Sequence, residues 1–379
     1  MYQHKFNSVV DVMESKSKIP REKKTLQFEE RAKLDHEVFT SLTENAFEFL
    51  ERSIQDFEKF PRFSVVHFCA ALEMFLKARL MREHWSLIVS KVEAANRAKF
   101  QQGDFVSVTM DLSLARLREV VGLQLSIEAC KSFEVVAKHR NKLIHFFHPD
   151  LSGDNNARAL IVSEQGRAWF HLHRLLTGWT EFTNFKSKIE QAEQGLRQHR
   201  KYLKAKFDAL ESEIKFLREK GHEIVECPAC EFAAAIDRRI NPKMSNWECR
   251  VCDNQFFTVA LICPRCEKES HISDDRTCPE CGEEISPEEL ADALEDPAEA
   301  YLVARGKIDG FSRGNCSFCD GYQTVVHCHD QYICSECFEF TDELEQCGWC
   351  SEPNNGDMDG SFYSGCNHCE GYAGHTRDD

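Results

Sequence analysis

The sequence of 379 residues lacks any apolar run of the roughly 18 residues that a membrane-spanning helix requires. Its N-terminus also lacks an apolar stretch of signal-peptide length. We therefore expect a cytoplasmic protein with no membrane contact. In a reducing compartment, closely spaced cysteine pairs indicate metal binding in preference to disulfides.

Cysteine is almost absent from the first part of the chain. Only Cys69 and Cys130 precede Cys227, whereas the other 17 of the 19 cysteines lie between Cys227 and Cys369. A chain of this length can hold two or three domains. The uneven distribution of cysteine predicts that the two parts of the chain are different kinds of protein.

Positive charge is scarce in the second part of the chain. Residues 1–222 contain 36 Lys and Arg against 30 Asp and Glu, a net charge of +6, whereas residues 223–379 contain 11 against 33, a net charge of −22. Phosphate backbones repel such an acidic region, whereas the basic part could bind them. We expect the acidic part to contact a protein partner or the chain's own basic part.

Apolar residues recur at helical spacing through most of the first part. Helices are predicted over 26–59 and 62–88, and a later helix begins at the cap Ser126 and ends before Pro149. From Phe182 to Leu217 the apolar steps of three and four contain one step of seven. This pattern predicts a long coiled-coil helix with a phase slip, which favours a second subunit as its partner. The alternative is an amphipathic helix that packs on its own bundle.

The stretch KHRNKLIHFFHPD, residues 138–150, ends the helix that begins at Ser126. It contains Arg140, Asn141 and His145. Arg140 and His145 point about 140° apart around a single helix, because they are five positions apart. A second copy of the helix, packed across a dimer axis, could bring both groups into one groove.

The segment R-N-K-L-I-H resembles the motif of the HEPN superfamily, and AALEMFLKARL, residues 70–80, resembles the second helix of that family. The resemblance covers residues 28–185. It implies an all-α helical bundle that acts as a homodimeric, metal-independent endoribonuclease, with RNA as substrate and a 2′,3′-cyclic phosphate as product. It also implies a place in bacterial antiviral or toxin-like defence.

The resemblance assigns roles to three residues. His145 would be the acid/base, since imidazole titrates near neutral pH, and Arg140 would stabilise the charge on the phosphorane. Asn141 would orient the histidine or hold a phosphate oxygen. Three further residues could support the site, namely Glu73, Lys77 and His148, of which Glu73 could pair with Arg140 across the bundle. The alternative is a non-catalytic HEPN-like scaffold whose zinc ribbons recruit a protein partner.

Sixteen cysteines form eight pairs with two residues between the members of each pair. Two such knuckles can surround one zinc ion tetrahedrally, so the sequence predicts about four structural zinc sites without an open position. None of these ions is needed for catalysis. Pairing successive knuckles gives the predicted ligands: Cys227, Cys230, Cys249 and Cys252; Cys263, Cys266, Cys278 and Cys281; Cys316, Cys319, Cys334 and Cys337; Cys347, Cys350, Cys366 and Cys369.

A cross-braced arrangement of the last knuckles is a second possibility. Cys328 and its neighbours His327 and His329 would then offer spare ligands, in a module that would resemble a RING-type ubiquitin ligase. Sequential pairing is favoured, because it leaves a single cysteine over in this region.

The predicted fold class is an all-α N-terminal bundle with a long coiled-coil helix, followed by an array of small β zinc ribbons. The predicted domains are an N-terminal tail at 1–27, the HEPN-like bundle at 28–185, the coiled-coil helix at 186–222, ribbon 1 at 223–258, ribbon 2 at 259–285, a helical linker at 286–310, ribbon 3 at 311–340 and ribbon 4 at 341–379.

Overall fold

The computed structural model describes residues 21–145, 155–239, 243–307, 309–329 and 331–375. The chain divides into two compact units, Met1–Ala209 and Leu210–Asp379, and the boundary falls within helix α8. Among the described helices, none is both long enough and apolar enough to cross a bilayer. Most of the predicted tail at 1–27 and the candidate His148 lie outside the described residues.

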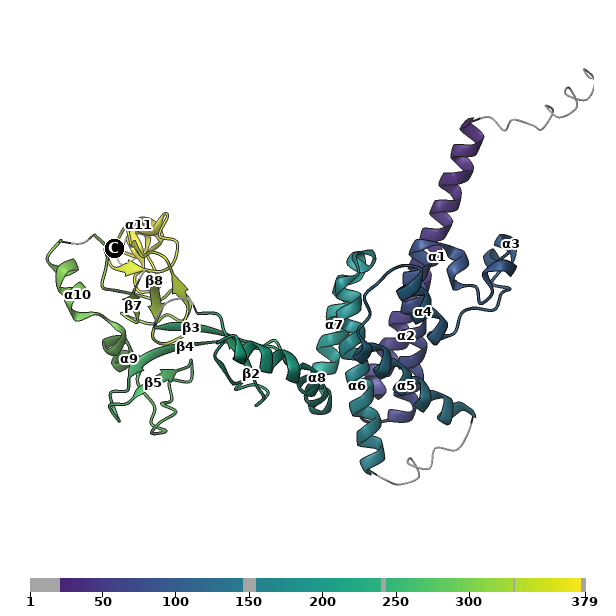
Figure 1. The fold of residues 1–379 in the computed structure, drawn as a ribbon. Coiled ribbons are helices and arrows are strands. Elements are labelled where there is room, and N and C mark those ends of the chain that lie inside the picture. The colour runs from purple at the N-terminus through teal and green to yellow at the C-terminus, as the bar shows by residue number, and fades with distance from the viewer. Residues whose placement is uncertain (1–20, 146–154, 240–242, 308, 330, 376–379) are drawn as a thin grey trace, which may run out of the picture. The chain divides into compact units, whose positions relative to one another are not determined.

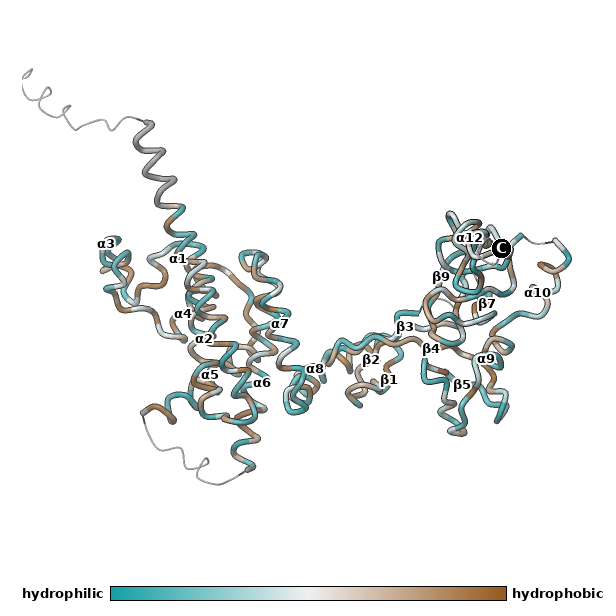
Figure 2. Tube along the Cα trace, turned by 180° about the vertical axis from the view of Figure 1, so that it is seen from behind, coloured by the Kyte–Doolittle hydropathy of each residue, from teal (hydrophilic) through white to brown (hydrophobic). Residues whose placement is uncertain are grey.

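The described part of the first unit is helical, as the sequence predicts. Along these helices the colour of the tube in Figure 2 changes repeatedly between hydrophilic and hydrophobic, as expected for helices with one buried face. The elements are α1 (Arg21–Asp56), α2 (Pro61–Glu83), η1 (Trp85–Ile88), η2 (Val92–Ala94), α3 (Arg97–Gln101), α4 (Met110–Glu119), α5 (Ile127–His145), α6 (Asn155–Gly178), η4 (Thr180–Phe185), α7 (Lys186–Arg197) and α8 (Arg200–Glu219).

Helix α2 is the centre of this bundle, since it contacts α1, α4, α5 and α6. Pro61 occupies its first turn, where a missing N–H is harmless, and most of the apolar residues from Val65 to Met81 are buried. Phe75 is fully buried and meets Phe47 edge-on, with 4.9 Å between the ring centroids. Phe182 of η4 also packs against Phe75, with 6.1 Å between the centroids. Aromatic packing therefore joins η4 to the first two helices.

The segment predicted as one long coiled-coil helix contains a break. Helix α7 ends at Arg197 and α8 begins at Arg200, within the predicted step of seven between Leu196 and Leu203. Helix α7 packs on α1 and α6 of the same chain. The side chains of Tyr202 and Ala205 on α8 surround Gly166 of α6. The apolar face of α7 and of the start of α8 is thus covered within the bundle.

The second unit consists mainly of short antiparallel strands, again as predicted (Figure 1). A five-stranded sheet contains β1 (Ile224–Glu226), β2 (Ala233–Asp237), β3 (Met244–Cys249), β4 (Gln255–Ile262) and β5 (Glu269–Ile272) in sequence order. A four-stranded sheet contains β6 (Arg313–Gly314), β7 (Val325–Cys328), β8 (Gln331–Cys334) and β9 (Phe340–Thr341), and a third sheet pairs β10 (Glu345–Gln346) with β11 (Pro353–Asn354). The helices are α9 (Pro287–Leu294), α10 (Pro297–Ala304), α11 (Ser361–Ser364) and α12 (Gly371–His375).

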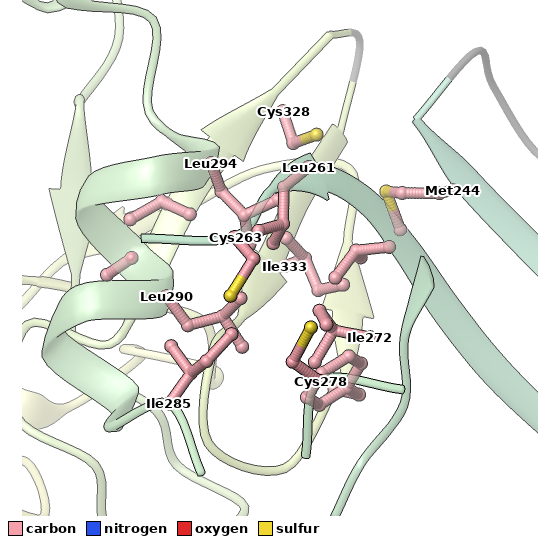
Figure 3. Packing of buried hydrophobic residues seen from close by; sticks show 14 residues of the cluster. Met244, Leu261, Cys263, Ile272, Cys278, Ile285, Leu290, Leu294, Cys328 and Ile333 are labelled. Carbon is pink, nitrogen blue, oxygen red and sulfur yellow. The ribbon is translucent and has the colours of Figure 1, made fainter. Parts of the chain in front are cut away.

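The second and third cysteine-rich segments share a hydrophobic core with helix α9. Figure 3 shows Leu290 and Leu294 pointing from α9 toward Cys263 and Ile333. Helix α9 begins with a capping box, in which Ser286 and Glu289 satisfy each other's backbone N–H groups. The helix between the ribbons is therefore part of a core and not an isolated spacer.

Candidate functional site

The sixteen paired cysteines gather into four sets, each with one sulfur atom per residue and all four sulfurs within 4.8 Å of one another. The sets are those that sequential pairing predicts. In the first set, Sγ of Cys227 lies 3.6 Å from Sγ of Cys252, and Sγ of Cys230 lies 3.6 Å from Sγ of Cys249. Two sulfurs that each lie about 2.3 Å from a tetrahedral zinc are about 3.8 Å apart. The sulfur spacing therefore fits a zinc-sized tetrahedral ion.

Seven of the eight knuckles share one backbone conformation. The N–H of the first cysteine donates to the carbonyl oxygen five residues later, as in Cys227 to Phe232 at 3.0 Å. The residue after the second cysteine is left-handed, as in Glu231 with φ 60° and Phe338 with φ 60°. Such a conformation is unfavourable for a side chain with a Cβ, so repeated use of it indicates a turn held by its cysteines.

The knuckle Cys366/Cys369 differs from the other seven. Its second cysteine N–H donates to the carbonyl oxygen of Cys366 at 3.2 Å, in a turn between α11 and α12. The sulfurs still complete the fourth set, with Cys350 Sγ 3.8 Å from Cys366 Sγ. The fourth set thus combines one ribbon knuckle with one helical turn.

Hydrogen bonds to sulfur support the thiolate form of the cysteines. The backbone N–H of Val251 donates to Cys249 Sγ at 3.4 Å. The Ser270 hydroxyl lies 3.4 Å from Cys278 Sγ, and this hydrogen bond lowers the pKa of the Cys278 thiol to about 6. Sequence spacing identifies the ligands but not a supporting residue such as Ser270, because its contact depends on how β5 pairs with β4.

Cys328, His327 and His329, the additional ligands of the cross-braced alternative, do not belong to any of the four cysteine sets. Cys328 is buried in the hydrophobic cluster that includes α9, and burial raises the pKa of its thiol. His327 Nδ1 lies 2.9 Å from Glu299 Oε1. Among the described residues, none of the four sulfur sets includes Cys328, His327 or His329. Sequential pairing is therefore the arrangement in the structure.

The basic end of α5 contacts α2 through an ion pair. Arg140 Nη2 donates to Glu73 Oε1, which is the contact that the sequence analysis allowed for. Lys77 lies one turn further along α2, with its Nζ 3.6 Å from the second Glu73 oxygen and 3.2 Å from Ser107 Oγ. The Arg140 side chain is 27% exposed, so this cluster of two cations and one anion is open to solvent.

Cys69 lies next to this cluster, although the sequence gives it no role in the predicted site. It precedes Glu73 by one turn, and its Sγ donates to the carbonyl oxygen of Val136 at 3.3 Å. Burial raises the pKa of the Cys69 thiol to about 12, although the charge of Arg140 opposes the shift. A neutral thiol excludes Cys69 as a thiolate nucleophile. The spacing of Cys69, Glu73 and Lys77 at successive turns is the signal that could have grouped them.

Of the other two predicted catalytic residues, the structure describes the side chain of Asn141 but not that of His145. Asn141 is exposed on α5, and His145 is the last residue of that helix, although its side chain lies outside the described residues. His139, which precedes Arg140 on α5, lies with its Nε2 2.5 Å from Glu164 Oε2 of α6. The structure therefore brings together Arg140, Glu73 and Lys77, and it leaves Asn141 facing solvent.

Comparisons with known proteins do not identify a relative. No family model matches the chain, no curated protein matches it, and no solved structure matches it.

Proposed function

We propose that the helical unit is a metal-independent, homodimeric endoribonuclease of the HEPN type, in a defence or toxin-like role, and that the second unit is a zinc-bound adaptor for a protein partner. The observation that carries the nuclease proposal is the partly exposed end of α5. There Arg140 and Asn141 stand within two turns of His145, and Arg140 shares the carboxylate of Glu73 with Lys77 of α2. The cluster retains an excess of positive charge, which suits a phosphodiester.

The chemistry requires only groups that this helix end carries. A base removes the proton from a 2′-hydroxyl, the 2′-oxygen attacks phosphorus, and the 5′-oxygen leaves with a proton from an acid. His145 serves in proton transfer, with the second histidine from the partner protomer. Arg140 stabilises the phosphorane by a charge-assisted fork, and Asn141 holds a phosphate oxygen. The products are a 2′,3′-cyclic phosphate and a 5′-hydroxyl.

A second function for the helical unit has its own supporting observation. Glu73 already neutralises the guanidinium of Arg140. A permanent ion pair of this kind would make Arg140 a structural link between α2 and α5 in a non-catalytic scaffold. The two functions differ in what a lysine at position 140 does, because lysine keeps the charge but loses the bidentate fork.

The decisive experiment is RNA cleavage by the full-length protein without added divalent metal. Arg140→Ala and His145→Ala should each lower the cleavage rate at least about 100-fold, because each removes a group that acts on the transition state. Arg140→Lys should also lose cleavage while its melting temperature stays near that of the wild type. The cyclic phosphate is identified by mass spectrometry of the products.

Matched controls separate catalysis from folding. Arg167 is exposed on α6 and His36 is exposed on α1, so Arg167→Ala and His36→Ala should leave cleavage unchanged. Undiminished cleavage in Arg140→Ala and His145→Ala would rule out the nuclease function. Equal, non-additive loss of stability in Arg140→Ala and Glu73→Ala, with no cleavage in the wild type, would support the scaffold.

The zinc assignment has a separate basis. Thiolates select zinc among the common intracellular divalent ions, and four of them leave no open position for catalysis. Native mass spectrometry of the purified protein should detect four bound ions, one for each set of cysteines. The acidic charge of this unit favours a protein over a nucleic acid as its partner.

A further inference from the structure

The C-terminal part of the second unit has no lysine or arginine over a long interval. Between Arg313 and Arg377 the sequence contains neither Lys nor Arg. Among the described residues of 341–375, no carboxylate forms an ion pair with a basic side chain. The interval nevertheless contains eleven carboxylates: Asp320, Asp330, Glu336, Glu339, Asp342, Glu343, Glu345, Glu352, Asp357, Asp359 and Glu370.

Four aromatic side chains gather beside the fourth cysteine set, and we call them the aromatic patch: Trp349, Phe362, Tyr363 and Tyr372. The rings of Phe362 and Tyr372 are stacked, with 6.0 Å between centroids and 12° between planes. Tyr363 meets Tyr372 edge-on at 6.1 Å, and Trp349 meets Phe362 at 5.5 Å. Tyr363 is 65% exposed, and Phe362 and Tyr372 are each 45% exposed.

The backbone around the fourth cysteine set fixes this patch in place. A Cβ at Gly348, within the knuckle that carries Trp349, would lie 2.9 Å from the backbone nitrogen of Phe362. A Cβ at Gly365, where φ is +77°, would lie 2.0 Å from the carbonyl oxygen of Cys369. Glycine at these positions lets α11 and α12 pack closely against the two knuckles of the fourth set. The exposed rings therefore stand on a rigid support, which reduces the entropy lost on binding.

We infer that the aromatic patch is a docking surface for a basic, arginine-bearing segment of a protein partner. Exposed tyrosine, tryptophan and phenylalanine are enriched at protein interfaces, and their ring faces attract guanidinium groups. The carboxylates of Asp359 and Glu370 lie within three residues of Phe362 and Tyr372 along the chain, and neither forms an ion pair with a basic side chain. They attract the same positive charge and repel the phosphates of a nucleic acid. This inference rests on the adaptor role proposed for the second unit and not on RNA cleavage.

The test is fluorescence anisotropy with the full-length, metal-loaded protein. The probes are two labelled peptides of equal length and charge, one alternating arginine with serine and the other alternating lysine with serine. The arginine peptide should bind more tightly than the lysine peptide. Tyr363→Ala and Tyr372→Ala should each weaken its binding about two- to fivefold, which is the effect of one exposed cation–π contact.

Tyr301→Ala is the matched control, since Tyr301 is an exposed tyrosine on α10 of the same unit. It should bind the arginine peptide like the wild type. If both patch variants bind the arginine peptide as tightly as the wild type, or if the wild type binds the two peptides equally, the aromatic patch is not the docking surface. Neither result would contradict the adaptor role. Absence of binding to both peptides by the wild type would also overturn the docking surface. An RNA oligonucleotide whose binding is weakened by Tyr363→Ala and Tyr372→Ala would contradict the inference, because the patch would then contact nucleic acid.

Discussion

The helical unit and the cysteine-rich unit differ in what fills their interiors. Among the twelve largest fully buried side chains of the described residues, only Trp247 belongs to the second unit. The first unit buries Trp169, Tyr202 and a group of phenylalanines. In the second unit many buried positions are cysteines, and its strands are short. Burial of apolar area can hold the first unit together, whereas we expect the second to need metal ions in its cysteine sets.

The two units also treat charge differently. In the first unit the buried carboxylate of Glu193 accepts hydrogen bonds from the Trp169 ring N–H at 2.7 Å, from the Tyr202 hydroxyl at 2.7 Å and from Lys206 Nζ at 2.9 Å. In the second unit, the sequence between Arg313 and Arg377 contains eleven carboxylates and neither Lys nor Arg. The first unit therefore compensates a buried charge internally, whereas the C-terminal part of the second unit carries acidic charge that no lysine or arginine of the same interval compensates.

Removal of metal should affect the stability of the two units most differently, and we expect it to have the largest effect of the changes proposed. Structural zinc sites contribute about 10–16 kcal/mol each to folding in zinc-finger peptides, so a strong chelator should unfold the second unit. The first unit should keep its helices. Hydrogen exchange with mass spectrometry should show protection lost after residue 223 and retained in α2. Protection lost equally in both units would contradict this division.

A single-cysteine comparison refines the metal prediction. Cys278→Ala removes a ligand of the second set, whereas Cys328→Ala removes a buried cysteine outside the sets. Native mass spectrometry should show three bound ions in Cys278→Ala and four in Cys328→Ala. Loss of an ion from Cys328→Ala would restore the cross-braced arrangement.

The next effect concerns the core of the first unit. Phe75→Ala should lower the free energy of unfolding of this unit by about 3–5 kcal/mol, because it leaves a cavity between Phe47 and Phe182. The number of bound ions should not change. Phe63→Ala is the control, since Phe63 is 62% exposed on the same helix. Chemical denaturation followed by helical circular dichroism measures both variants.

A pH titration tests the buried charge of the first unit. Burial alone would raise the pKa of Glu193, but the charges of Lys206 and His173 together with the hydrogen bonds from Lys206 and Tyr202 outweigh it and hold the pKa at about 2. A carboxyl whose pKa is lower in the folded state stabilises the fold above its unfolded pKa, and this stabilisation is lost as the pH falls toward 2. The loss should be about 3 kcal/mol in the wild type and absent in Glu193→Gln. An identical acid dependence in the two proteins would show that Glu193 is not responsible.

The sequence predicts the chemistry of the second unit better than its architecture. Cysteine spacing alone identifies the four sulfur sets, because two residues between ligands fix the knuckle. The shared core of α9 with two cysteine-rich segments depends on packing between distant residues, which local spacing does not encode. The break after Arg197 shows the same limit. The spacing of apolar residues predicts only a phase slip within one helix at this point. In the structure a separate helix, α8, begins there, and its Tyr202 packs against α6.

The smallest effect compares one kind of helix cap in both units. Ser126 accepts from the N–H of Ala129 at the start of α5, and Ser286 accepts from the N–H of Glu289 at the start of α9. Each change to alanine should cost about 1 kcal/mol. In Ser126→Ala this cost should lower the denaturation midpoint of the first unit. In Ser286→Ala the same cost should appear only as a lower affinity for metal, measured with a competing chelator. The reason is that the second unit, if metal-dependent, folds and binds metal in a single coupled equilibrium. If Ser286→Ala lowers the denaturation midpoint of the second unit while all metal ions stay bound, the apolar core around α9 stabilises that unit independently of metal. The two units would then differ only in how much of their stability comes from apolar burial.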